Sequence, residues 1–376
     1  MPEKKRHHYV PQLYLKYFSK DKKTISVFSH KENRIVARNA PIKRQCYKNY
    51  LYSKHKKYED VISSIEDKSK KIIDDILLSK TIPRKKNSDY SLLLLFILFQ
   101  SARTLFATEQ VNENLNKMGK LILKEAIRLK KHKGINPKDI DELQLNWDEP
   151  ALLNLQSVSQ ILPLLYDLEC KIIINETTNE FITSDNPVIL YNKFYLKDEL
   201  NYTGFASKGL IIMFPLTPNF SLIFFDSMIY KIGGKKLHKP VYCKNKSDVD
   251  EINMLQMINA HNTTYSFSME EKYLIKLSSI ASKYRFEEKT IVKESELFEP
   301  INGKKSKIIW TSRPKIKYNL NVSFIKIRKK ITDSYLKQKL VRDPLLVKLH
   351  KEFLELVDKK YYKPNELGKF LKDKER

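Results

Sequence analysis

The 376-residue sequence predicts an α+β fold in which a helical N-terminal half packs on a mixed or antiparallel sheet, with a basic C-terminal extension. Two observations predict this class. Hydrophobic residues recur at helical spacing as far as residue 168, and short β-branched and aromatic runs separated by Pro and Gly follow. A hydrophobic content of 41%, with 21 Tyr and 18 Phe, is sufficient for a core. We therefore expect segregated helices and strands rather than a doubly wound sheet.

The N-terminal half is expected to be mainly helical after a short mixed segment. Pro11 suits the first turn of a short helix, and Ser88 or Asp89 can cap a long one. The expected elements are a short helix over 9–19, strands over 24–28 and 34–37, and helices over 58–78, from about 88 to 131, and over 151–168.

The second half is expected to be richer in strands, because its apolar runs are short and bounded by turn residues. A basic region and a closing helix end the chain. The expected elements are strands over 172–174, 181–184, 210–214, 220–225 and 228–232, helices over 248–260 and 271–282, strand-like segments over 307–310 and 322–328, and a helix over about 344–360.

We divide the chain into a main α+β domain, residues 1–302, and a basic C-terminal extension, residues 303–376. The main domain comprises a basic segment over 1–57, a helical part over 58–168 and a sheet-rich part over 169–302.

The formal net charge of +26 is concentrated at the two ends of the chain. Residues 1–57 carry +13 and residues 303–376 carry +14, whereas the middle carries −1. Clustered cations favour a polyanionic partner, because each neutralised phosphate releases counterions, so we expect DNA or RNA as a partner. Lys outnumbers Arg 58 to 12, as a low-GC coding bias would produce, but such a bias would not place the charge at the ends.

The cysteine content and the hydropathy predict a cytoplasmic protein without a membrane segment. Three widely spaced cysteines form neither a disulfide framework nor a thiolate zinc site. The charged N-terminus lacks the apolar stretch of a signal peptide. The longest apolar run, residues 92–99, has eight residues, against the roughly 18 that a membrane span requires.

The first candidate site is the run from His7 to Gln12, which precedes the short helix. A helix N-terminus attracts anions, and a histidine there can bind or protonate a phosphate oxygen. Adjacent residues of an extended segment point to opposite sides, so one histidine is expected to face a site. The alternative is structural: a helix cap and a packed imidazole, or an extension of the basic tail formed by Lys4, Lys5 and Arg6.

The run His7-His8-Tyr9-Val10-Pro11-Gln12, continued by Tyr14, Leu15 and Phe18, resembles the opening motif of a large, mostly bacterial domain-of-unknown-function family, whose signature begins His-His-x-Val-Pro-x-x-Tyr-Leu. Residues 7–266 carry the resemblance. Its further elements are Gln100-Ser101-Ala102-Arg103, the Ser-Asp-Asn-Pro element within Thr183–Val188, the Phe-Pro-Leu-Thr-Pro run Phe214–Pro218, and the Asn-rich segment Asn253–Tyr265. The family name implies no activity, so the resemblance indicates which residues to inspect.

Gln100 and Arg103 lie three residues apart on an expected helix and therefore share a face. They follow an apolar run that must be buried, and a buried Arg requires a partner. Arg103 is expected either to form a structural ion pair with Asp185 or another carboxylate, or to bind a phosphate or carboxylate ligand.

Asp185 and Asn186 follow an expected strand and precede Pro187, which holds Asn186 extended. In a functional interpretation, Asp185 is a base, a metal ligand or the group that orients a histidine, and Asn186 donates a hydrogen bond to substrate. In a structural interpretation, the pair forms an Asx-turn at a hairpin corner.

Familiar catalytic patterns fit poorly. His30 and His55 have unsuitable spacings for a His-Asn-His metal finger, and the triplet Glu169-Cys170-Lys171 is weak support for a restriction-type core. The isolated Gly233-Gly234 pair is neither a Walker loop nor a dinucleotide fingerprint.

The sequence favours a nucleic-acid-directed hydrolase, a nuclease, as an effector in bacterial antiviral defence or a toxin. His7 or His8 would act as general acid or base, Arg103 would stabilise the phosphate charge, and Asp185 would orient the histidine or bind a divalent metal ion, which stays open as a cofactor. The alternatives are a non-catalytic nucleic-acid-binding subunit of a larger defence complex, and an enzyme for a small anionic substrate. The expected substrate-binding residues are Gln12, Gln100 and Asn186.

Overall fold

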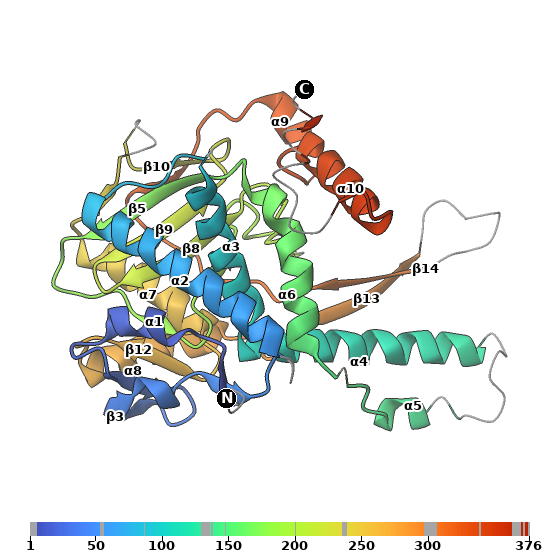
Figure 1. The fold of residues 1–376 in the computed structure, drawn as a ribbon, viewed down its shortest axis with the longest axis horizontal. Helices are drawn as coiled ribbons and strands as arrows, with labels where there is room; N and C mark the ends of the chain where they lie inside the picture. Colours follow the sequence, from blue (N-terminus) through green and yellow to red (C-terminus); the bar gives the residue numbers. More distant parts are fainter. Residues whose placement is uncertain are drawn as a thin grey trace.

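The computed structural model describes residues 6–52, 56–85, 87–128, 136, 138–146, 148–199, 201–234, 239–296, 307–337, 340–362, 370 and 373–374. Two sheets form the centre of the molecule, and helices cover them (Figure 1). The expected α+β class, with a helical N-terminal half packed on a mixed sheet, is confirmed.

The larger sheet has five strands in the order β11-β5-β9-β8-β7. Neighbouring strands are antiparallel except β11 and β5, which are parallel, so the sheet is mixed. The bounds are β5 Glu169–Asn175, β7 Ile189–Tyr191, β8 Ile211–Thr217, β9 Phe220–Phe225 and β11 Val241–Cys243.

Side chains that alternate along these strands supply two separate cores. Ile172 and Ile174 of β5 pack in one core with the N-terminal helices, whereas Ile173 packs in the other with the later helices. Because both faces are covered, every residue of β5 after Glu169 is buried. The helices on the first side are α2 Lys56–Ser79, α3 Ser88–Ala102 and α6 Pro150–Ile161, and those on the second are α7 Lys246–Asn259 and α8 Glu271–Ala281.

The smaller sheet joins the two ends of the family-like region, residues 7–266. Its order is β3-β2-β12-β6, and every pair is antiparallel. Beside it, β1 pairs with β4, and the short helix α1 follows β1. The bounds are β1 Arg6–His8, α1 Gln12–Leu15, β2 Thr24–Ser29, β3 Arg34–Pro41, β4 Tyr47–Asn49, β6 Thr183–Ser184 and β12 Thr263–Ser266.

The single helix expected from about residue 88 to 131 is wrong, because the structure has two helices with an angle of 61° between them, α3 and α4 Leu105–Arg128. The break lies at Arg103 and Thr104. Thr104 caps the new helix, since its hydroxyl accepts a hydrogen bond from the Ala107 N–H at 3.1 Å. Among the described helices none is long and apolar enough to cross a membrane alone; the bent pair α3 and α4 reaches that length and composition only in combination.

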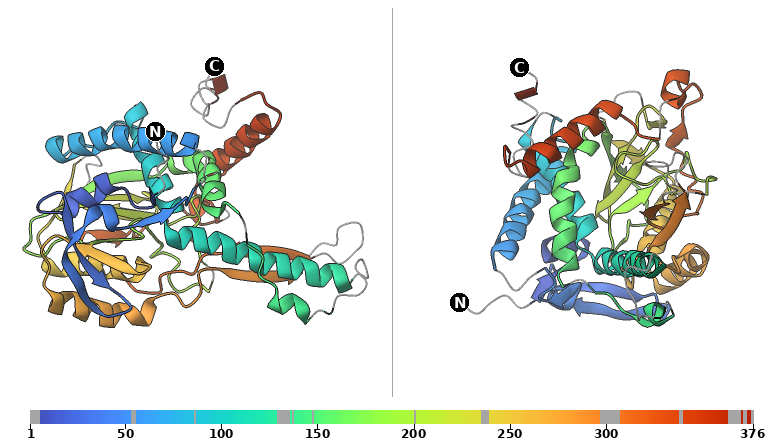
Figure 2. Two further views of the ribbon diagram at one scale, coloured as in Figure 1. Left: turned by 60° about the horizontal axis from the view of Figure 1, so that its bottom comes forward. Right: turned by 90° about the vertical axis from the view of Figure 1, so that its right-hand side faces the viewer.

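The helix α4 projects from the body together with a hairpin of two strands, β13 and β14 (Figures 1 and 2). The strand β15 returns to the body and pairs with β10. The remaining bounds are α5 Asp139–Glu142, β10 Tyr230–Ile232, β13 Ile291–Glu296, β14 Lys307–Ser312, β15 Ile325–Ile327, α9 Asp333–Lys337 and α10 Pro344–Asp358.

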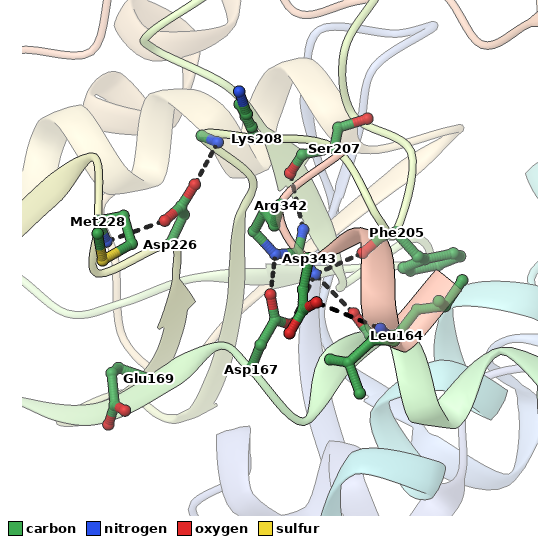
Figure 3. A network of polar contacts seen from close by, with 12 residues as sticks. Leu164, Asp167, Glu169, Phe205, Ser207, Lys208, Asp226, Met228, Arg342 and Asp343 are labelled. Carbon is green, nitrogen blue, oxygen red and sulfur yellow. Dashed lines mark hydrogen bonds and ion pairs between the residues drawn. The ribbon is translucent and has the colours of Figure 1, made fainter. Parts of the chain in front are cut away.

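Arg342 joins the basic C-terminal part to the main body (Figure 3). Its guanidinium donates to both carboxylate oxygens of Asp167, at 2.8 and 3.0 Å. It also donates to three backbone carbonyls at 2.6–2.7 Å, those of Leu164, Phe205 and Ser207. The bidentate pair and its additional acceptors account for an arginine whose side chain is 3% exposed. The domain division at residue 302 stays a prediction, and these contacts cross it.

Candidate functional site

A cleft of about 610 Å³ lies between the N-terminal segment and α2. We call it the His8 cleft. Cations, carboxylates and an imidazole line it together, so it can both bind charge and transfer protons. Its polar lining residues are Arg6, His8, Gln12, Lys43, Glu59, Ser63 and Glu66.

The pairing of β1 with β4 directs the two adjacent histidines to opposite sides, as extended geometry predicts. His7 is 4% exposed, and its ring stacks on Tyr52 with 5.3 Å between centroids. His8 lies in the wall of the cleft. His7 is therefore a packing residue, and His8 is the histidine that lines the cleft.

The hydrogen bonds of His8 define its tautomer. Its Nδ1 lies 3.0 Å from the Gln45 carbonyl oxygen, which only accepts, so Nδ1 carries the proton. Its Nε2 therefore accepts, and the Gln12 amide donates to it at 2.9 Å. Burial lowers the pKa of His8, the nearby Arg103 and Arg6 cations act in the same direction, and the bond to Gln45 opposes them. The ring is thus a neutral base whose Nε2 lies on the cleft side.

Arg103 lies behind the cleft wall and is 1% exposed. It donates to Gln100 Oε1 at 3.0 and 2.8 Å and to Glu66 Oε1 at 2.5 Å. Gln100 in turn donates to the Tyr9 carbonyl at 3.0 Å. Burial opposes the charge of Arg103, but Glu66 and other neighbours hold its pKa above the ordinary value. The partner carboxylate of Arg103 is therefore Glu66, which also lines the cleft, rather than Asp185.

Asp185 has a different environment. Its carboxylate is 2% exposed and accepts the backbone N–H groups of His261, Asn262 and Thr263 at 2.8, 2.7 and 3.1 Å. Burial raises the pKa of this carboxyl, against the effects of His261 and of these hydrogen bonds. The carboxylate fastens the turn between α7 and β12, and it does not line the His8 cleft.

Asn186 also makes structural contacts. Its Oδ1 accepts from the Thr104 hydroxyl at 3.2 Å, and its Nδ2 donates to the Asn259 carbonyl at 2.9 Å. These bonds connect the start of α4 to the end of α7. Asn186 lines a separate small hollow, described below, and not the His8 cleft.

A sequence model for a family described as protein of unknown function, DUF4238, matches residues 6–269. The chain belongs to the DUF4238 family. No curated protein and no solved structure matches it. The DUF4238 region contains every residue that lines the His8 cleft, together with Arg103, Asp185 and Asn186. The basic part after residue 302 lies outside it.

Besides Lys43, three lining residues on α2 were absent from the sequence-based interpretation: Glu59, Ser63 and Glu66. They lie four and three residues apart on α2 and so share one face of that helix. The spacing was a readable signal, but polar residues at helical spacing are also typical of a solvated face.

Within the described residues no group of three or more His, Cys, Asp and Glu side chains is arranged to hold a metal ion. The described residues thus provide no set of ligands for the divalent ion that the sequence left open.

Proposed function

We propose that this protein is a nucleic-acid-directed phosphodiester hydrolase whose chemistry takes place in the His8 cleft. The observation that carries the proposal is the neutral His8 ring, held through Nδ1 by a backbone carbonyl, with its accepting Nε2 toward a cleft that Arg6 and Lys43 also line. A base beside cations is what proton removal and phosphate stabilisation require together.

In this mechanism, His8 Nε2 takes the proton of the attacking oxygen, which is water or a nucleic-acid hydroxyl. The attacking group displaces the Gln12 amide, which occupies that position in the unbound protein. Arg6 and Lys43 bind the phosphate oxygens as charge develops. Glu59 is the second proton-transfer group of the cleft, and in its protonated form it donates a proton to the leaving oxygen.

The N-terminal segment, residues 6–52, suits a polyanion. All Lys and Arg residues in 6–52 are exposed. Only Arg34 forms an ion pair with a described residue, Glu32. Exposed cations without carboxylate partners remain available to phosphates, and their binding weakens with salt. The basic residues are Arg6, Lys16, Lys20, Lys22, Lys23, Lys31, Arg34, Arg38, Lys43, Arg44 and Lys48.

A second candidate is a non-catalytic nucleic-acid-binding subunit of a larger complex. One observation favours it: His8 Nε2 already has an intramolecular partner, and Arg103 directs its guanidinium to Gln100 and Glu66. In this case the basic surface binds the strand and the cleft residues only maintain the fold.

The variant His8→Asn separates the two candidates. An Asn side chain can still donate to the Gln45 carbonyl but has no basic nitrogen. We expect cleavage of mixed-sequence single-stranded DNA or RNA to fall about 10²- to 10⁴-fold, with unchanged strand affinity. Assays with added Mg²⁺ and with a chelator test the metal requirement, and expression in bacterial cells tests the proposed role as a cytoplasmic toxin or antiviral effector.

The matched control is His350→Asn in α10, since His350 also has a lowered pKa and a backbone partner, but lies outside the cleft. If folded His8→Asn protein cleaves as fast as the unmodified protein, the hydrolase proposal fails. A protein that binds strands but never cleaves them supports the second candidate.

A further inference from the structure

A second cleft, of about 550 Å³, lies where the β13–β14 hairpin meets the segment after α8. Three aromatic and five cationic side chains line it, together with the carboxylates Glu199, Glu287 and Glu288. Aromatic faces stack on nucleic-acid bases, and cations bind phosphates. The aromatic residues are Tyr284, Phe286 and Trp310, and the cations include Arg285, Lys315 and Lys317.

A small hollow of about 40 Å³ adjoins this cleft, since Phe286 and Pro314 line both. Arg313 and Thr203 line the hollow. Its volume is several times the roughly 10–15 Å³ that one water molecule requires, and it is too small for a whole metabolite. It therefore suits one compact group of a ligand whose remainder lies in the larger cleft.

Arg313 is the unusual residue of this hollow. Its guanidinium has no hydrogen bond or ion pair with any residue that the structure describes, and burial lowers its pKa. The nearby Arg285 shows the ordinary arrangement, because it donates to the Met257 and His261 carbonyls at 3.0 and 2.6 Å. Arg313 is partly buried, and a cation partly removed from water without a counter-charge is unfavourable, so Arg313 indicates an anionic ligand.

Thr203 supplies a second donor. The residue is 7% exposed, yet its hydroxyl has no partner within the described part of the chain. A guanidinium and a hydroxyl in one hollow can donate several hydrogen bonds to the oxygens of a single oxyanion.

We propose that this pair of cavities binds a nucleoside phosphate, with the phosphoryl group on Arg313 and Thr203 and the base against Tyr284, Phe286 or Trp310. The ligand is a free nucleotide or the phosphorylated end of a single strand. Arg313 and the hairpin lie outside residues 6–269, so the site is completed by a part of the chain beyond the family region. It shares no lining residue with the His8 cleft, so either proposal can fail without the other.

The test uses the full chain and isothermal titration with adenosine 5′-monophosphate, adenosine and inorganic phosphate. We expect the monophosphate to bind best. Arg313→Met should weaken its binding roughly tenfold or more, and Thr203→Val should weaken it less, since charge-assisted hydrogen bonds exceed neutral ones. The matched control, Arg84→Met at an exposed position, and His8→Asn should leave the affinity unchanged.

Thermal unfolding without ligand distinguishes a binding role from a structural one. Because Arg313 has no described partner, Arg313→Met should unfold at the same or a higher temperature than the unmodified protein. Equal binding of adenosine and its monophosphate, or unchanged binding by folded Arg313→Met, overturns the proposal. A strongly destabilised Arg313→Met protein that binds normally also overturns it.

Two further ligands identify the source of the nucleotide. A 5′-phosphorylated single-stranded oligonucleotide is compared with the same strand bearing a 5′-hydroxyl. An Arg313-dependent preference for the phosphorylated strand assigns the site to strand ends. Equal, Arg313-independent binding of both strands, with retained Arg313-dependent binding of the monophosphate, assigns it to free nucleotides. Either result supports the proposal.

Discussion

His8 and Asp185 lie in two motifs of the same family-like region, but their polar atoms are used in different ways. Each carboxylate oxygen of Asp185 accepts backbone N–H groups, and the residue is 2% exposed. His8 commits one ring nitrogen to the backbone and directs the other to a cleft, where a single Gln12 side chain covers it. The backbone N–H partners of Asp185 indicate a structural role. The Gln12 side chain, in contrast, can leave His8 by a change of rotamer, so His8 can act as a reactive group.

The largest effect is expected at Asp185. Asp185→Ala leaves three partly buried N–H groups without acceptors, and we expect a loss of roughly 3–5 kcal/mol in the free energy of unfolding, measured by urea denaturation. Asp185→Asn keeps one acceptor oxygen and should lose about half as much. Equal stability of both variants and the unmodified protein would show that the turn after α7 does not depend on this carboxylate.

Arg103 connects the interior to the cleft wall, and its ion pair with Glu66 is expected to have the second-largest effect on stability. A double-mutant cycle of Arg103→Met and Glu66→Gln should yield a coupling energy of about 1–3 kcal/mol, because Arg103 is buried and Glu66 is only partly so. The comparison cycle pairs Arg128→Met with Glu125→Gln, an exposed ion pair on α4, for which we expect a clearly smaller coupling energy. Similar coupling in both cycles would contradict the assigned role of Arg103.

The contrast between these residues also explains what the sequence could predict. Helices with clear local periodicity, such as α2, α7 and α10, were expected within a few residues of their observed bounds. The strands β7 and β11 were missed because each has three residues and no alternating pattern. The break before α4 was missed because Thr104, unlike Pro or Gly, is not a strong signal for the end of a helix.

The candidate site was predictable to the extent that it depends on side-chain types. The motif identified His8 and Gln12, and extended geometry separated His7 from His8. The acceptor role of Asp185 was not predictable, because its partners are backbone N–H groups, which every residue except Pro possesses. The contribution of Glu66 to both the cleft and Arg103 depends on how α2 packs, which no local pattern encodes.

His30 extends the comparison to pH. Burial, assisted by Arg285, lowers the pKa of His30 to about 3. Below about pH 6.5 the His30 side chain takes up a proton in the unfolded chain but not in the folded protein. As the pH is lowered, the free energy of unfolding should therefore decrease by about 1.4 kcal/mol per pH unit from this residue. Denaturation between about pH 6.5 and 5 should show a flatter slope for His30→Gln. An unchanged slope would mean that His30 accepts its proton in the folded state.

The smallest change in stability is expected at the residue with the largest expected effect on activity. His8→Asn keeps a donor for the Gln45 carbonyl and removes a ring that is only partly buried, so it should cost less than about 1 kcal/mol. Since His8 and Asp185 share no hydrogen-bond partner, the losses of His8→Asn and Asp185→Ala should add within about 0.5 kcal/mol. A strongly non-additive loss of stability would show that His8 and Asp185 belong to one structural network. Additive losses of stability, with activity abolished by His8→Asn alone, would show that His8 acts in the cleft and that Asp185 acts only in stabilising the fold.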